Sequence, residues 1–235
     1  MKAKKLELSP RLLCVCEMVR RGACIADIGT DHAFVPIYLV QSGRIRFAIA
    51  SDVAPGPLSK AREMVCENHM EDKIHVRLSD GLAEILPDEA EDIIISGMGG
   101  ETILSIIDAA PWLQSPKIRL ILQPMTMQAK LRKGLLSRGF YITDEKICRE
   151  GFRIYQIIAF EYDGQSRTAD PLMNEIGPII YQNRAQDAAL FSAYLEQRIR
   201  VLNTVISGKR KAGIDVSDEQ QLQNQFLKMR EECCK

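Results

Sequence analysis

Four short segments combine carboxylates with small residues, and each follows a run of apolar residues. They are 27–32 (DIGTDH), Asp52, Asp80-Gly81 and 97–100 (GMGG). Carboxylates bind cations and hydrogen-bond donors, and glycine lets a ligand approach the backbone closely. If the apolar runs are parallel strands, the four segments meet at one edge of a sheet, where such sheets bind ligands. The pattern therefore predicts a site for a small ligand with cationic or donor groups.

The first segment contains one glycine, Gly29, with Asp27 before it and Asp31 after it. A loop that binds a pyrophosphate has the pattern G-x-G-x-x-G, which lets backbone amides surround the anion. Two carboxylates repel that anion, and this disfavours a nicotinamide-dependent dehydrogenase. They suit S-adenosylmethionine, which carries a sulfonium and an ammonium group and no phosphate. We expect Asp27 or Asp31 to bind the ammonium group; the alternative, that they only cap the next helix, stays open.

The second and third segments offer partners for a nucleoside. Asp52 follows Gly29 by 23 positions, and an acid about 20 residues after such a turn commonly binds ribose hydroxyls. Asp80-Gly81 is placed to accept a hydrogen bond from the exocyclic amine of adenine. The same dipeptide is also an ordinary turn signal, so both interpretations stay open.

The fourth segment has three glycines after an apolar run, which indicates close approach of another molecule to the backbone. We expect the methyl group and its acceptor to meet here, with Asp31 and Gly97 as candidate catalytic residues. The Asn/Asp-Pro-Pro-aromatic motif of many amino-methyltransferases is absent from the segment. Of three histidines only His32 lies in the predicted site; it either contacts the ligand or holds the turn, and no metal is expected.

Alternating apolar runs and helical patterns must position these segments. The predicted strands are 24–28, 45–51, 74–78, 92–96 and 118–122, with helices between most of them. Two further runs, 141–149 and 153–162, are too close in sequence for a crossover helix and predict an antiparallel hairpin. The chain is therefore predicted to be an α/β protein with a doubly wound, Rossmann-like sheet and an antiparallel edge, as in class I methyltransferases.

The C-terminal part has no strand signal. Residues 163–170 read as a polar linker, and apolar spacings of three and four predict helices over 184–207 and 218–232. A break is expected between Gly208 and Gly213, around Lys209, Arg210 and Lys211. Neither helix can close a core alone, so we expect an antiparallel, coiled-coil-like pair. The predicted domains are 1–163, which binds the ligand, and 171–235, which is helical.

Composition sets wider limits. Lys+Arg and Asp+Glu both number 31, so net charge neither supports nor excludes nucleic acid as a partner. No apolar run approaches the ~20 residues of a membrane helix, and the Lys-rich start has no apolar segment typical of a secretory signal. The seven cysteines form no CxxC pair and are expected to be reduced thiols. We expect a soluble, cytoplasmic monomer.

In this order, the motifs resemble those of the bacterial tRNA adenine-N1 methyltransferases that modify adenosine 22 of tRNA. The matching segments are 9–12 (SPRL), 26–33 (ADIGTDHA), 51–53 (SDV) with 56–58 (GPL), 79–82 (SDGL), 96–100 (SGMGG), 122–124 (LQP) and 174–178 (NEIGP). The pair DIGTDHA and GMGG is fairly specific, whereas any one piece alone is not. The resemblance spans residues 9–178.

This resemblance implies S-adenosylmethionine as the methyl donor, tRNA as the acceptor and a helical C-terminal domain that helps to hold tRNA. It implies that Arg11 closes over the cofactor. It also implies that the cofactor is lined by Asp27, Gly29, His32, Asp52, Asp80, Gly81 and Gly97, together with Met98 and Gly99 of the same segment. The adenine N1 lone pair needs no strong base, and Phe34 or Tyr38 is a candidate for stacking on the target base.

Phosphate contacts require lysine and arginine. The candidates are Lys2, Lys4, Lys5 and Arg11, then Lys130, Arg132 and Lys133 on one helix, then Lys209, Arg210 and Lys211. Two alternatives remain open: a methyltransferase of the same fold that acts on another RNA, a protein or a small molecule, and a nucleotide-binding or RNA-binding module without catalysis.

Overall fold

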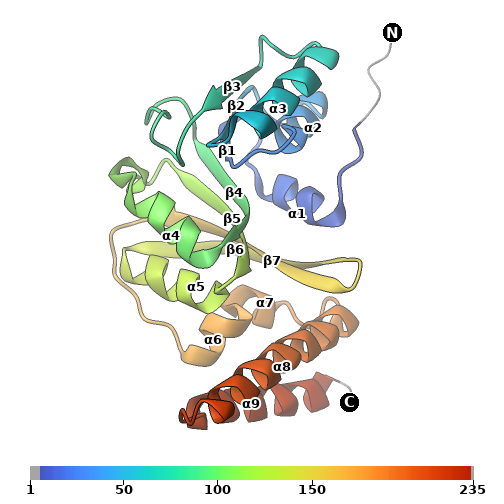
Figure 1. The fold of residues 1–235 in the computed structure, drawn as a ribbon, viewed down its shortest axis with the longest axis vertical. Helices are drawn as coiled ribbons and strands as arrows, with labels where there is room; N and C mark the ends of the chain where they lie inside the picture. The colour runs from blue at the N-terminus through green and yellow to red at the C-terminus, as the bar shows by residue number, and fades with distance from the viewer. Residues whose placement is uncertain (1–5, 234–235) are drawn as a thin grey trace.

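A computed structural model describes residues 6–233 of the chain (Figure 1); Lys2, Lys4 and Lys5 lie outside this range. In chain order the elements of the sheet region are α1 (Pro10–Met18), β1 (Cys24–Ile28), α2 (Phe34–Gln41), β2 (Phe47–Asp52), α3 (Pro55–Glu67), β3 (Ile74–Leu78), β4 (Asp92–Gly99), α4 (Gly100–Asp108), β5 (Arg119–Thr126), α5 (Gln128–Ser137), β6 (Phe140–Glu150) and β7 (Arg153–Tyr162). A 3-10 turn, Pro111–Leu113, lies between α4 and β5. The C-terminal helices are α6 (Pro171–Ile176), α7 (Pro178–Gln182), α8 (Ala188–Lys211) and α9 (Ser217–Cys233).

One sheet runs through the molecule in the order β3-β2-β1-β4-β5-β7-β6. Strands β1 to β5 pair in parallel, and β7 pairs antiparallel with both β5 and β6. The strand order reverses between β1 and β4, so the switch point lies there. This confirms the predicted Rossmann-like sheet with an antiparallel hairpin edge.

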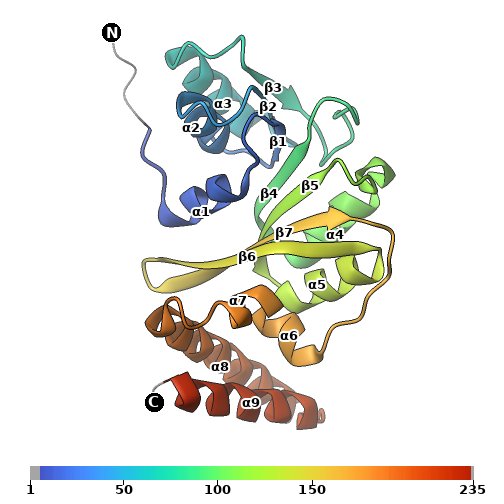
Figure 2. The same cartoon turned by 180° about the vertical axis from the view of Figure 1, so that it is seen from behind.

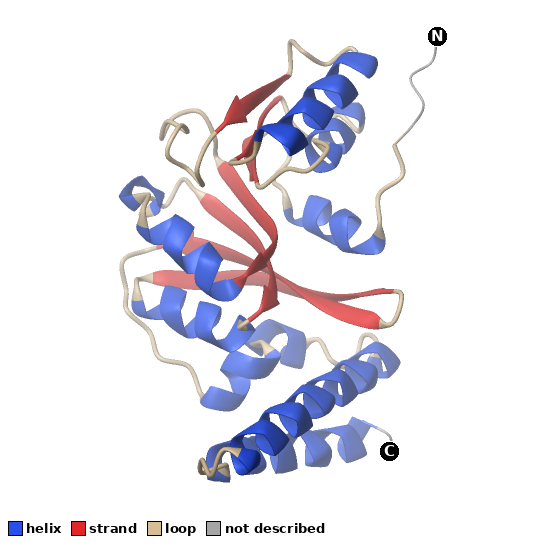
Figure 3. Cartoon of the chain, viewed as in Figure 1, coloured by secondary structure: helices blue, strands red, loops and turns tan. Residues whose placement is uncertain are grey.

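Helices cover both faces of the sheet, which is why its central strands are almost wholly apolar. Alternate side chains of one strand enter different clusters: Ile25 packs with α1, α2 and α3, whereas Ala26 packs with α4 and α5. Figure 3 shows these helices on either side of the strands. In the part of the chain that the structure describes, we find no helix long and apolar enough to cross a membrane.

The glycine-rich segment differs from its predicted form. The expected strand ended at Ser96, but β4 continues through Gly99 and β5 continues through Thr126. The two ends pair, with Met98 opposite Pro124 and register shifts on either side of Met98. Proline cannot donate to a sheet and glycine weakens a strand, so a bulged extension is a form that residue preferences alone would not predict.

The C-terminal helices α8 and α9 form the predicted antiparallel pair (Figure 2). Lys209 bonds to Glu219, and Asn203 bonds to Gln223 further along. The predicted boundaries were wrong at two places. Helix α8 begins at Ala188 rather than 184, after the short helices α6 and α7. It also continues through Gly208 to Lys211, and the chain turns only at Gly213, whose φ is +69°.

A buried polar cluster joins these helices to the sheet. Arg132 is fully buried, and its guanidinium donates to Glu145 at 2.7 Å, to Gln156 at 2.5 Å and to the Asn174 carbonyl at 2.8 Å. The second Glu145 oxygen accepts from the Ile179 amide, at the start of α7, at 2.9 Å. Arg132 was a predicted phosphate contact, and that prediction was wrong because its charge is used inside the protein.

Candidate active site at the strand ends

The carboxyl ends of β1 and β2 are joined directly. The amides of Gly29 and Thr30 donate to the Ser51 carbonyl at 2.8 and 2.9 Å. The Ser79 amide, after β3, donates to the Asp52 carbonyl at 3.0 Å. Three of the four segments selected from the sequence therefore lie along one edge of the sheet, as the parallel topology requires.

Asp27 is the buried carboxylate of this edge. Its exposed fraction is 7%, and burial raises its pKa to about 6. A hydrogen bond with the Thr30 side chain lowers that pKa, and the nearby charge of Asp52 raises it again. A desolvated carboxylate beside a second one attracts a cation, because a positive group relieves both burial and repulsion.

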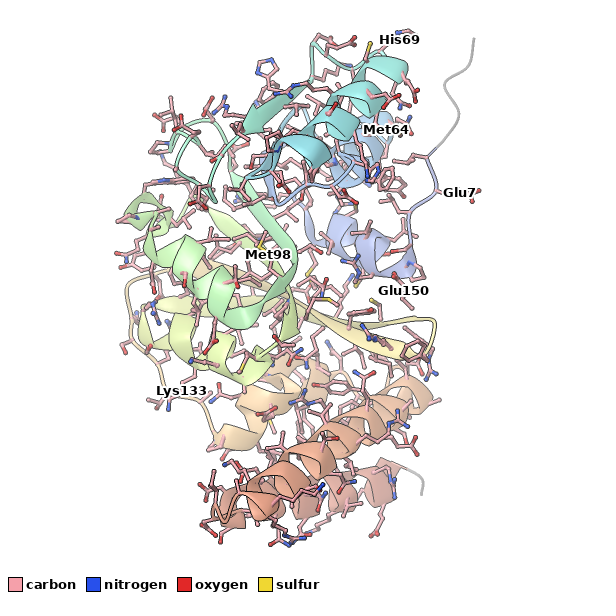
Figure 4. The ribbon with its side chains drawn as sticks, viewed as in Figure 1. Glu7, Met64, His69, Met98, Lys133 and Glu150 are labelled. Carbon is pink, nitrogen blue, oxygen red and sulfur yellow. The ribbon has the colours of Figure 1, made fainter. Side chains whose placement is uncertain are left out.

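Gly29 brings the first and fourth segments into contact. Its φ is +77°, and a Cβ added there would lie 2.2 Å from the Cε of Met98. The left-handed backbone favours glycine here, and the end of the flexible Met98 side chain, which comes from the central strand β4 (Figure 4), fills the space beside it. The predicted meeting of the turn after β1 with the glycine-rich segment is present in the structure.

Asp31 and His32 lie at the outer side of the first turn. Asp31 is exposed, and its Oδ2 lies 2.9 Å from His32 Nδ1. The imidazole stacks on the ring of Phe34, with a centroid distance of 4.9 Å. One face of Phe34 is therefore covered by His32, and the half-buried Tyr38 packs against the core. Stacking of either ring on a target base stays a prediction.

The nucleoside end of the edge contains polar and apolar side chains. Asp52 is half-buried, and its Oδ1 accepts from the Ala54 amide at 2.8 Å. Asp80 is exposed at the turn, with Gly81 at a φ of +55°. Two apolar residues to which the sequence analysis gave no role, Val53 of the matching SDV segment and Leu78, are 63% and 53% exposed here. Their position, each beside a strand-end carboxylate or turn, is the signal that would have found them.

Arg11 and Gln123 hold the glycine-rich segment. The Gln123 side chain is fully buried, and its Oε1 accepts from Arg11 Nη1 at 2.8 Å and from the Gly97 amide at 3.1 Å. Arg11 Nη1 also donates to Ser96 Oγ at 3.0 Å, and the Arg11 amide donates to Glu150 at 3.1 Å. Gln123 was part of the matching LQP segment but received no role, because only the three-dimensional pairing of β4 with β5 places it under Gly97.

Between residues 6 and 233, we find no cluster of three or more His, Cys, Asp or Glu side chains suited to a metal ion.

Comparison with known proteins gives the context of this edge. A family model described as a methyltransferase domain matches residues 8–158. The tRNA (adenine(22)-N(1))-methyltransferase of Bacillus subtilis (strain 168) is 36% identical over 187 residues, which is 77% of either chain. A Streptococcus pneumoniae protein in complex with S-adenosyl-L-methionine superposes with a TM-score of 0.81 at 31% identity, over 94% of this chain and 100% of its own.

TrmK of M. capricolum, in complex with the product S-adenosyl-homocysteine, superposes with a TM-score of 0.74 at 30% identity, over 96% of this chain and 97% of its own. The family model covers the whole parallel part of the sheet, and the Bacillus relative matches over more than three quarters of both chains. This chain belongs to the family of tRNA (adenine(22)-N(1))-methyltransferases.

Proposed function

We propose that this protein transfers a methyl group from S-adenosylmethionine to N1 of an adenosine in tRNA, at position 22 as in the named Bacillus relative. The observation that carries the proposal is the contact between two segments: the turn with buried Asp27, and the glycine-rich end of β4, whose Met98 closes on Gly29. A site built from these segments joins a cation-binding carboxylate to a backbone that an acceptor can approach.

The residues at the edge fit this cofactor. We propose that Asp27 binds the ammonium group, since its raised pKa reflects a carboxylate that lacks a positive partner. Gly29, His32 and Arg11 surround the same end. The Asp52 side chain, with one oxygen used by Ala54, binds the ribose hydroxyls with the other. Asp80-Gly81 receives the adenine, which packs between the exposed side chains of Val53 and Leu78.

The cofactor supplies a methyl group on a positively charged sulfur. Transfer forms a bond between adenine N1 and the methyl carbon and breaks the carbon–sulfur bond, whose electron pair stays on sulfur. N1 has a free lone pair, so the protein needs to align the atoms rather than remove a proton. The methylated base is cationic, and we propose that peptide oxygens of 97–99 and the Asp31 carboxylate stabilise this charge. Arg11 and Gln123 position Gly97 for that role.

The two predicted domains receive separate roles in the proposal. Residues 1–163 bind the cofactor, and residues 171–235 contact tRNA. Lys133 and the exposed Arg210 and Lys211 at the end of α8 are candidate phosphate contacts. The cytoplasmic location and the monomeric state stay predictions.

The test is transfer of labelled methyl from S-adenosylmethionine to unmodified bacterial tRNA, followed by nucleoside analysis. We expect 1-methyladenosine in the wild-type reaction, none in tRNA with guanosine at position 22, and none with Asp27→Ala. Circular dichroism of the variant checks that it is folded. Cofactor binding by calorimetry without methylation of any tRNA would refute the acceptor, and no cofactor binding would refute the methyltransferase assignment for this chain.

A further inference from the structure

A large cavity lies beside the glycine-rich segment, outside the cofactor edge. Its volume is about 1050 Å³. One wall is residues 124–130, where β5 ends and α5 begins; the others are the tip of the β6–β7 hairpin, Glu175 of α6 and one face of α8. The hairpin projects beyond the sheet between α1 and α8 (Figures 1 and 2). The Gln197 side chain fixes the hairpin to α8 through two bonds of 2.7 Å with Ile154.

The cavity adjoins the place proposed for methyl transfer. Thr126, which lines it, pairs with Gly99 across the ends of β5 and β4. A Cβ added to Gly99 would lie 3.3 Å from Thr126 Oγ1, and one added to Gly100 would lie 2.7 Å from the Met127 carbonyl. The cavity wall at the end of β5 is therefore next to the glycine-rich end of β4, where we propose that the acceptor binds. A nucleic-acid strand bound in the cavity could place its next nucleotide at that segment.

The side chains around the cavity combine exposed apolar groups with positive charge. Met125, Met127, Phe152 and Val201 are four of the nine large apolar side chains that are exposed in residues 6–233. Phe152 is 84% exposed at the hairpin tip, and the guanidinium of Arg153 lies 5.4 Å from the centre of its ring. Single exposed apolar residues are common, but four that line one cavity form a patch, and such a patch indicates a contact surface.

The side chains that line the cavity carry more positive than negative charge, and this indicates the kind of partner that it binds. Lys130, Arg153, Arg198 and Arg200 line the cavity, against one carboxylate, Glu175. Glu175 pairs with Arg198, and Lys130 pairs with Glu101. Arg153 and Arg200 form no ion pair with any residue that the structure describes. An aromatic ring with two cations that lack carboxylate partners is the combination that binds a single nucleic-acid strand, by stacking and by phosphate contacts.

We propose that this cavity binds the nucleotides adjacent to the methylated adenosine, with one base stacked on Phe152 and phosphates against Arg153 and Arg200. This inference rests on the proposed function and adds the surface that binds the tRNA strand next to the methylated adenosine. A protein partner or a second copy of the chain would also cover apolar side chains, but neither accounts for the excess of positive charge next to the acceptor segment.

The experiment compares four variants with the wild type: Phe152→Ala, Phe152→Leu, Arg200→Ala and, as a control, Arg62→Ala. Arg62 is exposed on α3, at the other end of the molecule from α8 (Figure 1). The measurements are kcat and KM for unmodified tRNA, direct tRNA binding at several salt concentrations, and calorimetry with S-adenosylmethionine. All three side chains are at the surface, so the unfolding temperatures of the variants should agree within a few degrees.

We expect both Phe152 variants to weaken tRNA binding about tenfold, since leucine keeps apolar contact but lacks a ring for stacking. Arg200→Ala should weaken it at low salt and reduce the slope of log Kd against log salt concentration by about one. Arg62→Ala should change neither, and cofactor affinity should be the same in all of them.

Unchanged tRNA binding and salt slope in Phe152→Ala and Arg200→Ala would overturn the inference, and full binding by Phe152→Leu would overturn the stacking. A dimer that is lost in Phe152→Ala, with tRNA binding intact, would overturn it in favour of an interface between copies. Wild-type protein that binds tRNA but does not methylate it would refute the proposed function, while the binding data would still decide this inference.

Discussion

Replacing Asp27 by asparagine should stabilise the free protein and abolish its activity. Asp27 is 7% exposed, and burial raises its pKa to about 6, against ~3.9 for an unperturbed aspartate. The folded state therefore holds the proton more tightly than the unfolded state, so stability falls as pH rises from about 4 to about 6. Because one pH unit corresponds to 1.36 kcal/mol, the full cost above pH 6 is ~3 kcal/mol.

The assay is urea unfolding of Asp27→Asn and the wild type, at about pH 7.5 and near pH 4. Asparagine keeps the size of the side chain and an acceptor for Thr30, but it carries no charge to desolvate. We expect the variant to be more stable by ~3 kcal/mol at the higher pH and the difference to be mostly lost near pH 4. S-adenosylmethionine should reverse the order, since a ligand at 1,000 times its Kd adds ~4 kcal/mol to the wild type alone.

A variant that is less stable than the wild type at both pH values would refute the reasoning. It would mean that other groups of the protein already offset the desolvation of the Asp27 carboxylate, so that the carboxylate needs no bound cation. A variant that gains stability but still methylates tRNA would leave the burial cost correct and remove Asp27 from the proposed ammonium site.

Three further substitutions test other contacts. Gln123→Ala removes the acceptor of three donors, Arg11 Nη1, Ser96 Oγ and the Gly97 amide, and should lower the free energy of unfolding in urea by ~1–3 kcal/mol. We expect kcat to fall at least tenfold with cofactor affinity retained; a loss confined to stability would show that Gln123 does not position the acceptor. Gly29→Ala should weaken cofactor binding in calorimetry, because alanine is strained at a φ of +77°; adding Met98→Ala should not restore binding, and a recovery would show that the contact with Met98 causes the loss. Arg132→Met should lower the free energy of unfolding in urea by ~3–5 kcal/mol, because Glu145 stays buried without its partner. A decrease below ~1 kcal/mol would indicate that water enters the cluster.

The parallel sheet was predictable because its signals are local. Buried strands such as β1 and β4 are mostly apolar runs followed by or ending in glycine, and the two residues between β6 and β7 permit only a hairpin. The extensions of β4 and β5 were not predictable, since glycine and proline are poor strand residues, and Gly99 and Pro124 enter the sheet only because they lie opposite Thr126 and Met98 at the ends of the two strands. Helix α8 passes Gly208 for a related reason: packing against α9 outweighs the ~1 kcal/mol that glycine costs in a helix.

The site divides in the same way. The residues at the carboxyl ends of β1, β2 and β4 were found because strand ends in a parallel sheet meet, whatever the side chains are. Gln123 and Phe152 were missed because a buried glutamine and an exposed phenylalanine contradict their usual preferences, and only coordinates reveal such exceptions. Arg132 was misplaced because a lysine- and arginine-rich helix resembles a solvated surface, and nothing local indicates that Glu145 and Gln156 converge on one of its cations.

The buried Arg132 cluster makes the sheet and the C-terminal helices interdependent. Arg132 donates a hydrogen bond to the Asn174 carbonyl of α6, and Glu145 accepts one from the Ile179 amide at the start of α7. A chain cut at residue 163 would therefore keep Arg132 and Glu145 in its interior. Each of them would lose a hydrogen bond that the C-terminal helices provide. The helices are thus not an appendage that can be removed without consequence. Unfolding should be a single cooperative transition, and amides of α7 should exchange with solvent as slowly as those of the sheet.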